Sequence, residues 1–261
     1  MTLEPQDSAG RHGPPAGGPP RWRRRLSGLA AAILLALAKL KTIALFALHI
    51  PMLGSALTFV LSAWVYGASF GWTFGVGFAL LLLLHELGHF VVIRRYGLPA
   101  GAPIFIPFLG AAIFLRQQPQ SPQQEYAIAA AGPLAGTLAS LAALLLGILL
   151  AQPVLRSLAY FGFLLQAFNL IPLWPLDGGR MVAAVDRHIW WVGIPLLLVV
   201  VWLSRSPIGL IIVALLLWQF FSQRRMASPD RYVAPAQRLA FGIGWIVMAI
   251  ANLGLARIAG G

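Results

Sequence analysis

The sequence predicts an all-α polytopic membrane protein with about six to seven membrane helices. Of the 261 residues, 59% are hydrophobic and only 10% are charged, whereas soluble proteins average about 25% charged residues. The runs 192–203 and 208–221 contain no charged residue at all. So few charges could not cover this much apolar surface in water, so a large soluble globular domain is excluded.

The first forty residues predict two segments ahead of the membrane core. Residues 1–25 are rich in Pro, Gly and Arg without periodicity, which predicts a disordered basic tail. Residues 26–41 predict an amphipathic interfacial helix, because Lys39 and Lys41 suit the level of the lipid headgroups. A signal peptide is the alternative, since Ala-Leu-Ala before Lys39 resembles a cleavage site.

The rest of the chain divides into a membrane core, 42–187, and C-terminal membrane helices, 188–261. Two of the apolar runs hold about 15 residues each, which is short for a full crossing and favours a tight or shallow helical hairpin. These are the runs 189–203 and 207–221. The other predicted spans are 43–66, 70–93, 127–150, 158–176 and 239–255.

One apolar segment is unsuited to a helix. Residues 99–115 contain three prolines and two glycines, which interrupt helical hydrogen bonding. Non-helical backbone at membrane depth is tolerated where it is buried in protein or lines a wet cavity. The sequence therefore predicts a re-entrant loop or short β-hairpin beside the second span, with an ordinary surface loop as the alternative.

Charge indicates topology here and not a nucleic-acid partner. The formal net charge is +12, and cytoplasmic loops of membrane proteins collect Lys and Arg. With the N-terminus in the cytoplasm, only Arg156, Arg205 and Arg257 of the nineteen basic residues would lie outside. The composition favours a bacterial plasma membrane. The absence of cysteine excludes disulfides and thiolate metal sites.

The motif HELGH, residues 85–89, places ionisable groups inside an apolar span. Such groups are costly at membrane depth and usually mark a functional site. His85 and His89 share one helix face, so both imidazoles can reach one zinc ion, with Glu86 as general base. His85 precedes Arg94 by nine residues, which places it roughly 13 Å below the cytoplasmic headgroups. Two core histidines with ordinary partners are the alternative.

Asp177 is the candidate for a third metal ligand, since zinc catalysis usually needs three protein ligands. Pro172 and Pro175 prevent a regular helix before it, and Gly178-Gly179 allow a sharp turn after it. An unwound segment could aim the Asp177 carboxylate at the metal. The other histidines are poor candidates: His12 lies in the tail, His49 beside Pro51 and His188 at an interface.

Together, HELGH, AGPLAG (131–136) and NLIPLWPLDGG (169–179) resemble the site-2 protease family of intramembrane zinc metalloproteases over about residues 43–187. The resemblance implies a zinc ion held by His85, His89 and Asp177, with Glu86 as catalytic base. It also implies that Asn169 binds the substrate carbonyl or oxyanion. The loop from Pro103 to Leu115 resembles the family's hairpin near the active site, which pairs with substrate as an added strand.

This chain resembles a compact form of the family, because it has no insertion large enough for a PDZ domain or a CBS pair. The Gly132-x-x-x-Gly136 pair predicts close helix packing and not a catalytic role.

The expected activity is hydrolysis of a peptide bond within or near a transmembrane segment, as in regulated intramembrane proteolysis. The expected partners are a transmembrane protein substrate and the lipid bilayer, whereas the sequence does not indicate an oligomeric state. One alternative is a transporter or ion pathway, although no internal repeat supports it. The other is an inactive relative that binds membrane proteins, although no expected ligand or base is missing.

Overall fold

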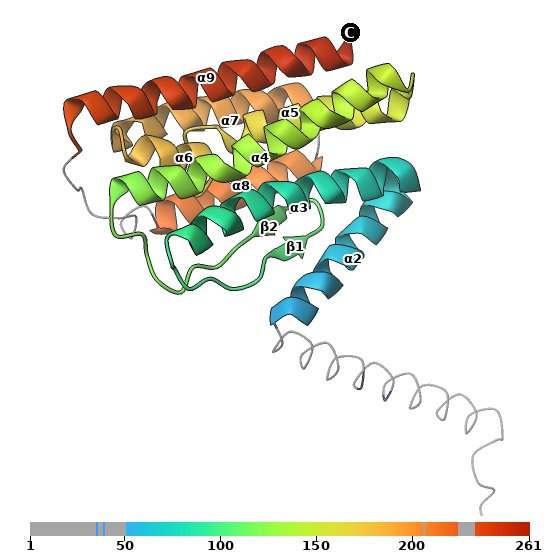
Figure 1. Cartoon of the computed structure of the whole chain (residues 1–261), viewed down its shortest axis with the longest axis horizontal. Helices are drawn as coiled ribbons and strands as arrows, with labels where there is room; N and C mark the ends of the chain where they lie inside the picture. The colour runs from blue at the N-terminus through green and yellow to red at the C-terminus, as the bar shows by residue number, and fades with distance from the viewer. Residues whose placement is uncertain (1–34, 36–38, 40–50, 206, 224–232) are drawn as a thin grey trace, which may run out of the picture. The chain divides into compact units, whose positions relative to one another are not determined.

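The computed structural model describes residues 35, 39, 51–205, 207–223 and 233–261 (Figure 1). The predicted tail 1–25, nearly all of the predicted interfacial helix 26–41 and the first residues of the predicted span 43–66 lie outside the described residues. Within the unit Ala47–Gly261, the helices are α2 (Pro51–Phe70), α3 (Trp72–Arg95), α4 (Pro122–Leu149), α5 (Pro153–Asn169), α6 (Asp177–Ala183), α7 (Trp190–Ser204), α8 (Pro207–Gln223) and α9 (Pro235–Gly260).

The described helices fall into two length classes. Four of them, α2, α3, α4 and α9, are long and apolar enough to cross a membrane. Helices α5, α7 and α8 hold only 17, 15 and 17 residues. The mostly helical membrane fold is thus confirmed, while six to seven spans stays a prediction. Large apolar side chains on these helices are exposed, for example Leu149, Trp202 and Leu239, as expected for surfaces in contact with lipid.

The predicted non-helical segment forms a β-hairpin. Strands β1 (Ile104–Ile106) and β2 (Gly110–Ala112) pair antiparallel, with Phe105 opposite Ala111. Helix α2 fastens the hairpin. The N–H of Phe105 donates to Thr58 Oγ1 at 3.2 Å, and the N–H of Phe108 donates to the Tyr66 hydroxyl at 3.0 Å. The outer edge of β1 is therefore covered by α2.

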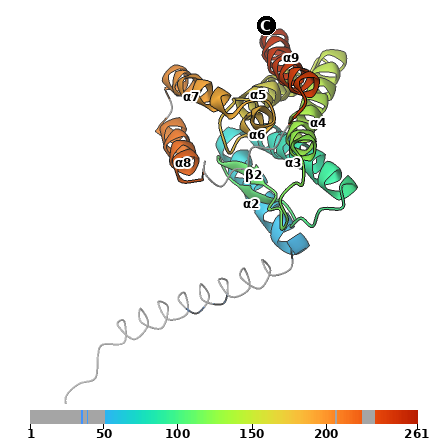
Figure 2. The same cartoon turned by 90° about the vertical axis from the view of Figure 1, so that its left-hand side faces the viewer.

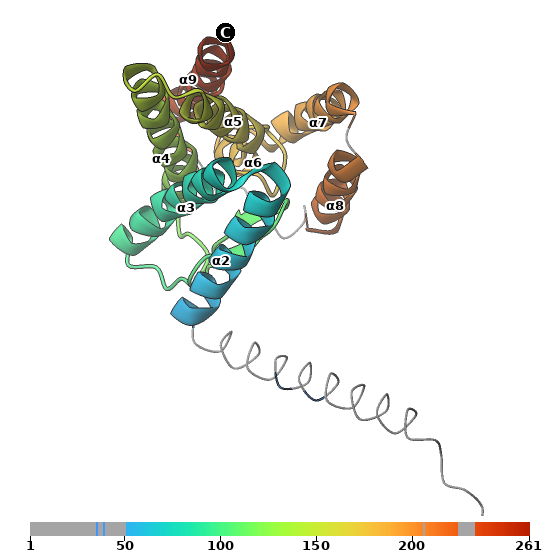
Figure 3. The ribbon, with the colours of Figure 1, turned by 90° about the vertical axis from the view of Figure 1, so that its right-hand side faces the viewer.

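Helices α3, α4 and α5 pack in sequence, and α9 lies along α4 and α5 (Figures 1 and 2). The contact between α3 and α4 depends on Gly88, because a Cβ there would lie 2.4 Å from the Ala131 carbonyl oxygen. Helices α7 and α8 lie side by side, with α5 and α6 between them and α4 (Figures 2 and 3). Helix α6 therefore lies between the α7–α8 pair and helices α3 and α4.

The segment between α5 and α6 is unwound, as the prolines predict, but it begins earlier than the sequence indicated. The predicted span 158–176 is wrong at both ends, since α5 runs from Pro153 to Asn169. Pro172 disfavours helical backbone in the residue before it, so the helix ends ahead of that position. The segment folds back tightly, because a Cβ on Gly178 would lie 2.1 Å from the Leu170 carbonyl oxygen.

Two indole N–H groups hold this unwound segment and the start of α6. Trp245 of α9 donates to the Leu170 carbonyl oxygen at 2.8 Å. Trp190, at the start of α7, donates to the Gly179 carbonyl oxygen at 2.7 Å. Helices α7 and α9 therefore fix the backbone on both sides of Asp177.

Replacing Trp245 with Phe should destabilise the fold by about 1–3 kcal/mol, because it leaves the buried Leu170 carbonyl without its donor. Thermal unfolding of purified protein in detergent measures the effect. Trp202→Phe is the matched control, since Trp202 is 74% exposed. Equal melting temperatures for the two variants would contradict this role of Trp245.

Candidate metal centre

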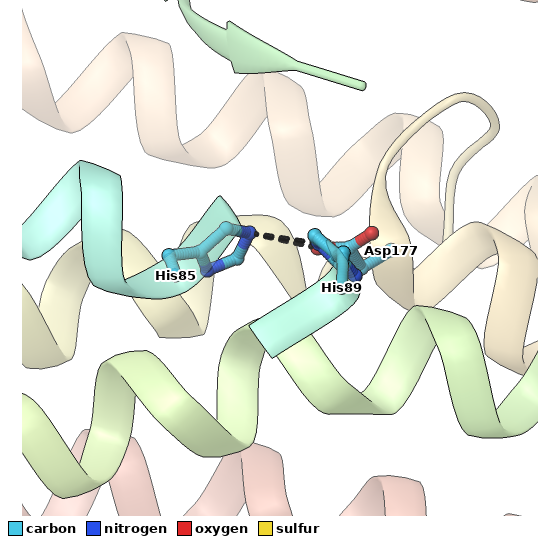
Figure 4. Close-up of side chains that lie close together, drawn as sticks. All are labelled: His85, His89 and Asp177. Atoms are coloured by element: carbon cyan, nitrogen blue, oxygen red, sulfur yellow. Dashed lines mark hydrogen bonds and ion pairs between the residues drawn. The ribbon is translucent and has the colours of Figure 1, made fainter. Parts of the chain in front are cut away.

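Three buried side chains from two helices meet at one point (Figure 4). His85 and His89 project from α3, and Asp177 is the first residue of α6. The Nε2 atoms of the two histidines lie 3.1 Å apart. Each Nε2 lies 3.2 Å from Asp177 Oδ2. The three donor atoms thus form a nearly equilateral triangle.

The outer ring nitrogens show how the protons are placed. His89 Nδ1 lies 2.7 Å from the carbonyl oxygen of Ile128 in α4. His85 Nδ1 lies 2.7 Å from Gln166 Oε1 in α5. A carbonyl oxygen can only accept a hydrogen bond, so both Nδ1 atoms carry the proton. Each neutral imidazole then presents the bare lone pair of Nε2 to the centre.

Three lone-pair donors facing one another at these distances repel unless a proton or a metal cation lies among them. Zinc in a tetrahedral site binds nitrogen and oxygen at about 2.0–2.2 Å, which puts neighbouring ligand atoms about 3.3 Å apart. The separations of 3.1–3.2 Å match that edge. The donor set therefore fits zinc. An ordinary pair of core histidines explains the Nδ1 bonds but not this convergence.

Glu86 and Asn169 line the same cavity as His85. The Glu86 side chain is buried and is not one of the three donors of the triangle. Asn169 is the last residue of α5, and its Nδ2 donates to the Leu165 carbonyl oxygen at 3.1 Å. Three of the five residues singled out in the sequence thus line one cavity, and the other two, His89 and Asp177, meet His85 in the triangle.

An ion pair that the sequence did not predict anchors α6. Arg180 Nε donates to Glu125 Oε1 in α4 at 2.7 Å, and Arg180 Nη1 lies 3.8 Å from Asp177 Oδ1. Burial opposes the charge of Arg180, but the two carboxylates hold its pKa above the usual value. The only feature of the sequence that could have indicated this interaction is the three-residue spacing from Asp177 to Arg180, which places both side chains on one helix face. The pair ties the helix bearing Asp177 to α4.

The two glycines of AGPLAG have a more specific place than general helix packing. A Cβ on Gly132 would lie 2.1 Å from His89 Nε2, and a Cβ on Gly136 would lie 2.3 Å from Gln166 Nε2. Gly132 therefore leaves room for the candidate metal ligand His89. Gly136 leaves room for Gln166, the hydrogen-bond partner of His85. The sequence indicated close packing but not what packs there.

The cavity beside this centre has a volume of about 1630 Å³. Small-molecule pockets usually measure about 300–1,000 Å³, so this space exceeds their usual size. Aromatic and aliphatic side chains form most of its wall. They include Phe74, Phe78, Phe108, Phe161, Leu215 and Trp245.

The fold and site thus define a membrane protein with a buried His-His-Asp centre beside an apolar cavity. Residues 73–160 match the family model of Peptidase family M50. This part of the chain is similar to that family, and the predicted resemblance to site-2 proteases is confirmed.

Individual relatives match longer stretches of the chain. Rip3 of Mycobacterium tuberculosis is 36% identical over 137 residues, covering 48% of this chain and 34% of Rip3. MJ0392 of Methanocaldococcus jannaschii, named a zinc metalloprotease, is 31% identical over 109 residues, covering 40% of this chain and 31% of MJ0392. A solved structure, the site-2 protease from M. jannaschii, aligns with a TM-score of 0.46 and 24% identity, covering 68% of this chain and 91% of that one. The chain spans about a third of the length of the two curated relatives.

Gly132→Ala should weaken zinc binding about 10- to 100-fold, the range typical when the surroundings of a ligand are disturbed. The new methyl group would displace His89, whose Nε2 lies 2.1 Å from its position. Zinc affinity of purified protein, measured against a competing chelator, gives the answer.

Gly254→Ala is the matched control, because a Cβ there meets no atom within 4 Å. It should bind zinc like the wild type. Equal zinc affinity for both variants would show that Gly132 does not shape the site.

Proposed function

We propose that this protein is an intramembrane zinc metalloprotease that hydrolyses a peptide bond within or near a transmembrane segment of another protein. The observation that carries the proposal is the triangle of His85 Nε2, His89 Nε2 and Asp177 Oδ2, with sides of 3.1–3.2 Å. Two of its corners lie on the apolar helix α3, and His85 lines a cavity too large for a small metabolite. Site geometry and surroundings together favour hydrolysis of a membrane-embedded polypeptide.

His85, His89 and Asp177 would hold the zinc ion, and the Nδ1 bonds keep both imidazoles in the form that binds metal. A bound zinc ion supplies a Lewis acid that polarises water and the scissile carbonyl. Glu86 adjoins His85 on α3 and lines the cavity. It would accept a proton from the attacking water and pass that proton to the leaving nitrogen.

Asn169 would orient the substrate. One of its two Nδ2 hydrogens is used by the Leu165 carbonyl, at 3.1 Å, which leaves the second for an oxygen in the cavity. A donor held in this way can stabilise the oxyanion as charge develops on the scissile carbonyl. The carbonyl of Leu165 fixes the amide before substrate arrives.

The hairpin offers one edge to an extended substrate. Thr58 already accepts the outward N–H of Phe105 in β1, whereas the β2 residues Gly110, Ala111 and Ala112 line the cavity. We therefore assign β2 as the edge to which an unwound substrate segment adds as a strand. A helical substrate must unwind first, because its peptide bonds are otherwise hydrogen-bonded and shielded.

The proposed topology has the N-terminus in the cytoplasm and the active site toward the cytoplasmic side of a bacterial plasma membrane. The distribution of Lys and Arg supports this orientation. Helices α5, α7 and α8 would complete a set of six to seven membrane helices. A transporter is less favoured, because the sequence has no internal repeat to support it.

Glu86→Gln should retain zinc and lower the rate of cleavage by about 100- to 10,000-fold, the contribution typical of a general acid–base. Membrane proteins that accumulate in cells carrying the variant, compared with wild type, identify the substrate. Cleavage of that substrate in vesicles with purified protein then measures the rate.

His85→Ala is the companion variant, and it should lose both zinc and activity. A Glu86→Gln protein that cleaves at the wild-type rate would eliminate Glu86 as the base. Wild-type protein whose cleavage survives complete removal of metal would contradict the proposed function.

A further inference from the structure

Gln166 is a buried polar residue at the junction of three helices. It lies on α5 and has no exposed surface. Its Oε1 lies 2.7 Å from Nδ1 of His85 on α3. On the side of α4, its amide fills the space beside Gly136. No motif of the sequence drew attention to this residue.

The amide leaves one buried donor unused. Among the described residues, Gln166 Nε2 has no hydrogen-bond partner. Buried donors without partners are rare, because they lose their hydrogen bonds to water without compensation. A feature of this kind needs an explanation, and it often lies in a functional constraint.

The functional constraint on the Gln166 amide comes from its neighbour His85. The amide can present either its oxygen or its NH₂ group to His85 Nδ1. If it presented the NH₂ group, Nδ1 would have to accept, and the proton of neutral His85 would move to Nε2. A protonated Nε2 cannot bind metal. The His85 Nε2 atom can bind metal only when Gln166 turns its Oε1 toward His85. In that orientation the NH₂ group of Gln166 has no hydrogen-bond acceptor among the described residues.

The backbone of α4 is shaped for this amide. A Cβ on Gly136 would lie 2.3 Å from Gln166 Nε2 and 2.4 Å from Gln166 Cδ. Any larger residue at position 136 would therefore push the amide away from its place beside His85. Gly136 and Gln166 act as a pair in holding the ring of His85.

We propose that Gln166 is a positioning residue for His85: its carbonyl oxygen fixes the ring orientation and the tautomer that presents Nε2 to the metal. The inference rests on the proposed zinc site and adds a residue that the three motifs do not contain. Partners of this kind typically change metal affinity about 10- to 100-fold when they are removed.

The test compares zinc affinities of purified full-length variants, with a chromophoric chelator as competitor. Gln166→Met keeps the length of the side chain but removes the acceptor, and it should bind zinc about 10- to 100-fold more weakly. Gln166→Glu keeps an acceptor oxygen in the same place and should restore affinity to near the wild-type value. A purely structural role of the amide would not produce this rescue.

Two further variants distinguish the proposed role of Gln166 from misfolding and from general packing effects. Gly136→Ala leaves Gln166 unchanged but displaces its amide, so it should weaken zinc binding as Gln166→Met does. Ser140→Ala is the control, since the Ser140 hydroxyl is buried at the same interface and donates to the Gly136 carbonyl oxygen at 2.8 Å without touching a ligand. It should bind zinc like the wild type.

The possible outcomes separate this inference from the proposed function. Wild-type protein that binds no zinc would overturn both. Wild-type binding together with unchanged affinity in Gln166→Met would overturn the role of Gln166 alone. Equal loss of affinity in Gln166→Met and Gln166→Glu would show that the amide acts through packing and not as an acceptor, which also overturns the inference.

Discussion

The convergence of three lone pairs at one buried point is the constraint on which the rest of the molecule depends. His85, His89 and Asp177 approach within 3.1–3.2 Å, and the bonds at both Nδ1 atoms leave each neutral imidazole with its lone pair at Nε2. Such an arrangement is unfavourable without a cation. Helices α3, α4, α5 and α6 must therefore be held firmly enough to maintain it, and their packing reflects this need.

Small residues and indole hydrogen-bond donors hold these helices together, because hydrophobic burial cannot do so within a lipid bilayer. Lipid tails are as apolar as the side chains of the helices, so close packing and hydrogen bonds must hold the bundle together. Gly88 lets α3 approach α4, and Gly132 leaves space for His89. Trp190 and Trp245 hold the unwound backbone around Asp177. The same contacts that assemble the bundle thus set the geometry of the centre.

The sequence indicated the residues of the metal centre more completely than the residues that hold them in position. HELGH in an apolar span and Asp177 after two prolines indicated the candidate donors, and the resemblance to the site-2 protease family implied that all three bind one zinc ion. The predicted fourth span ran to 176, whereas α5 ends at Asn169, because Pro172 disfavours helical backbone in the residue before it. Gln166 and the Arg180–Glu125 pair were missed, because polar residues at helix–helix junctions acquire their role only from the neighbouring helix. That information is tertiary and leaves no local pattern.

The most direct test of this account is X-ray absorption spectroscopy at the zinc edge, on purified protein with its metal content measured in parallel. The account predicts one zinc ion per chain, with two imidazole nitrogens and a carboxylate oxygen at about 2.0–2.2 Å among its ligands. The imidazole signal should fall when His85 or His89 is replaced by Ala. Folded protein that binds zinc only below stoichiometry, or without imidazole ligands, would contradict it.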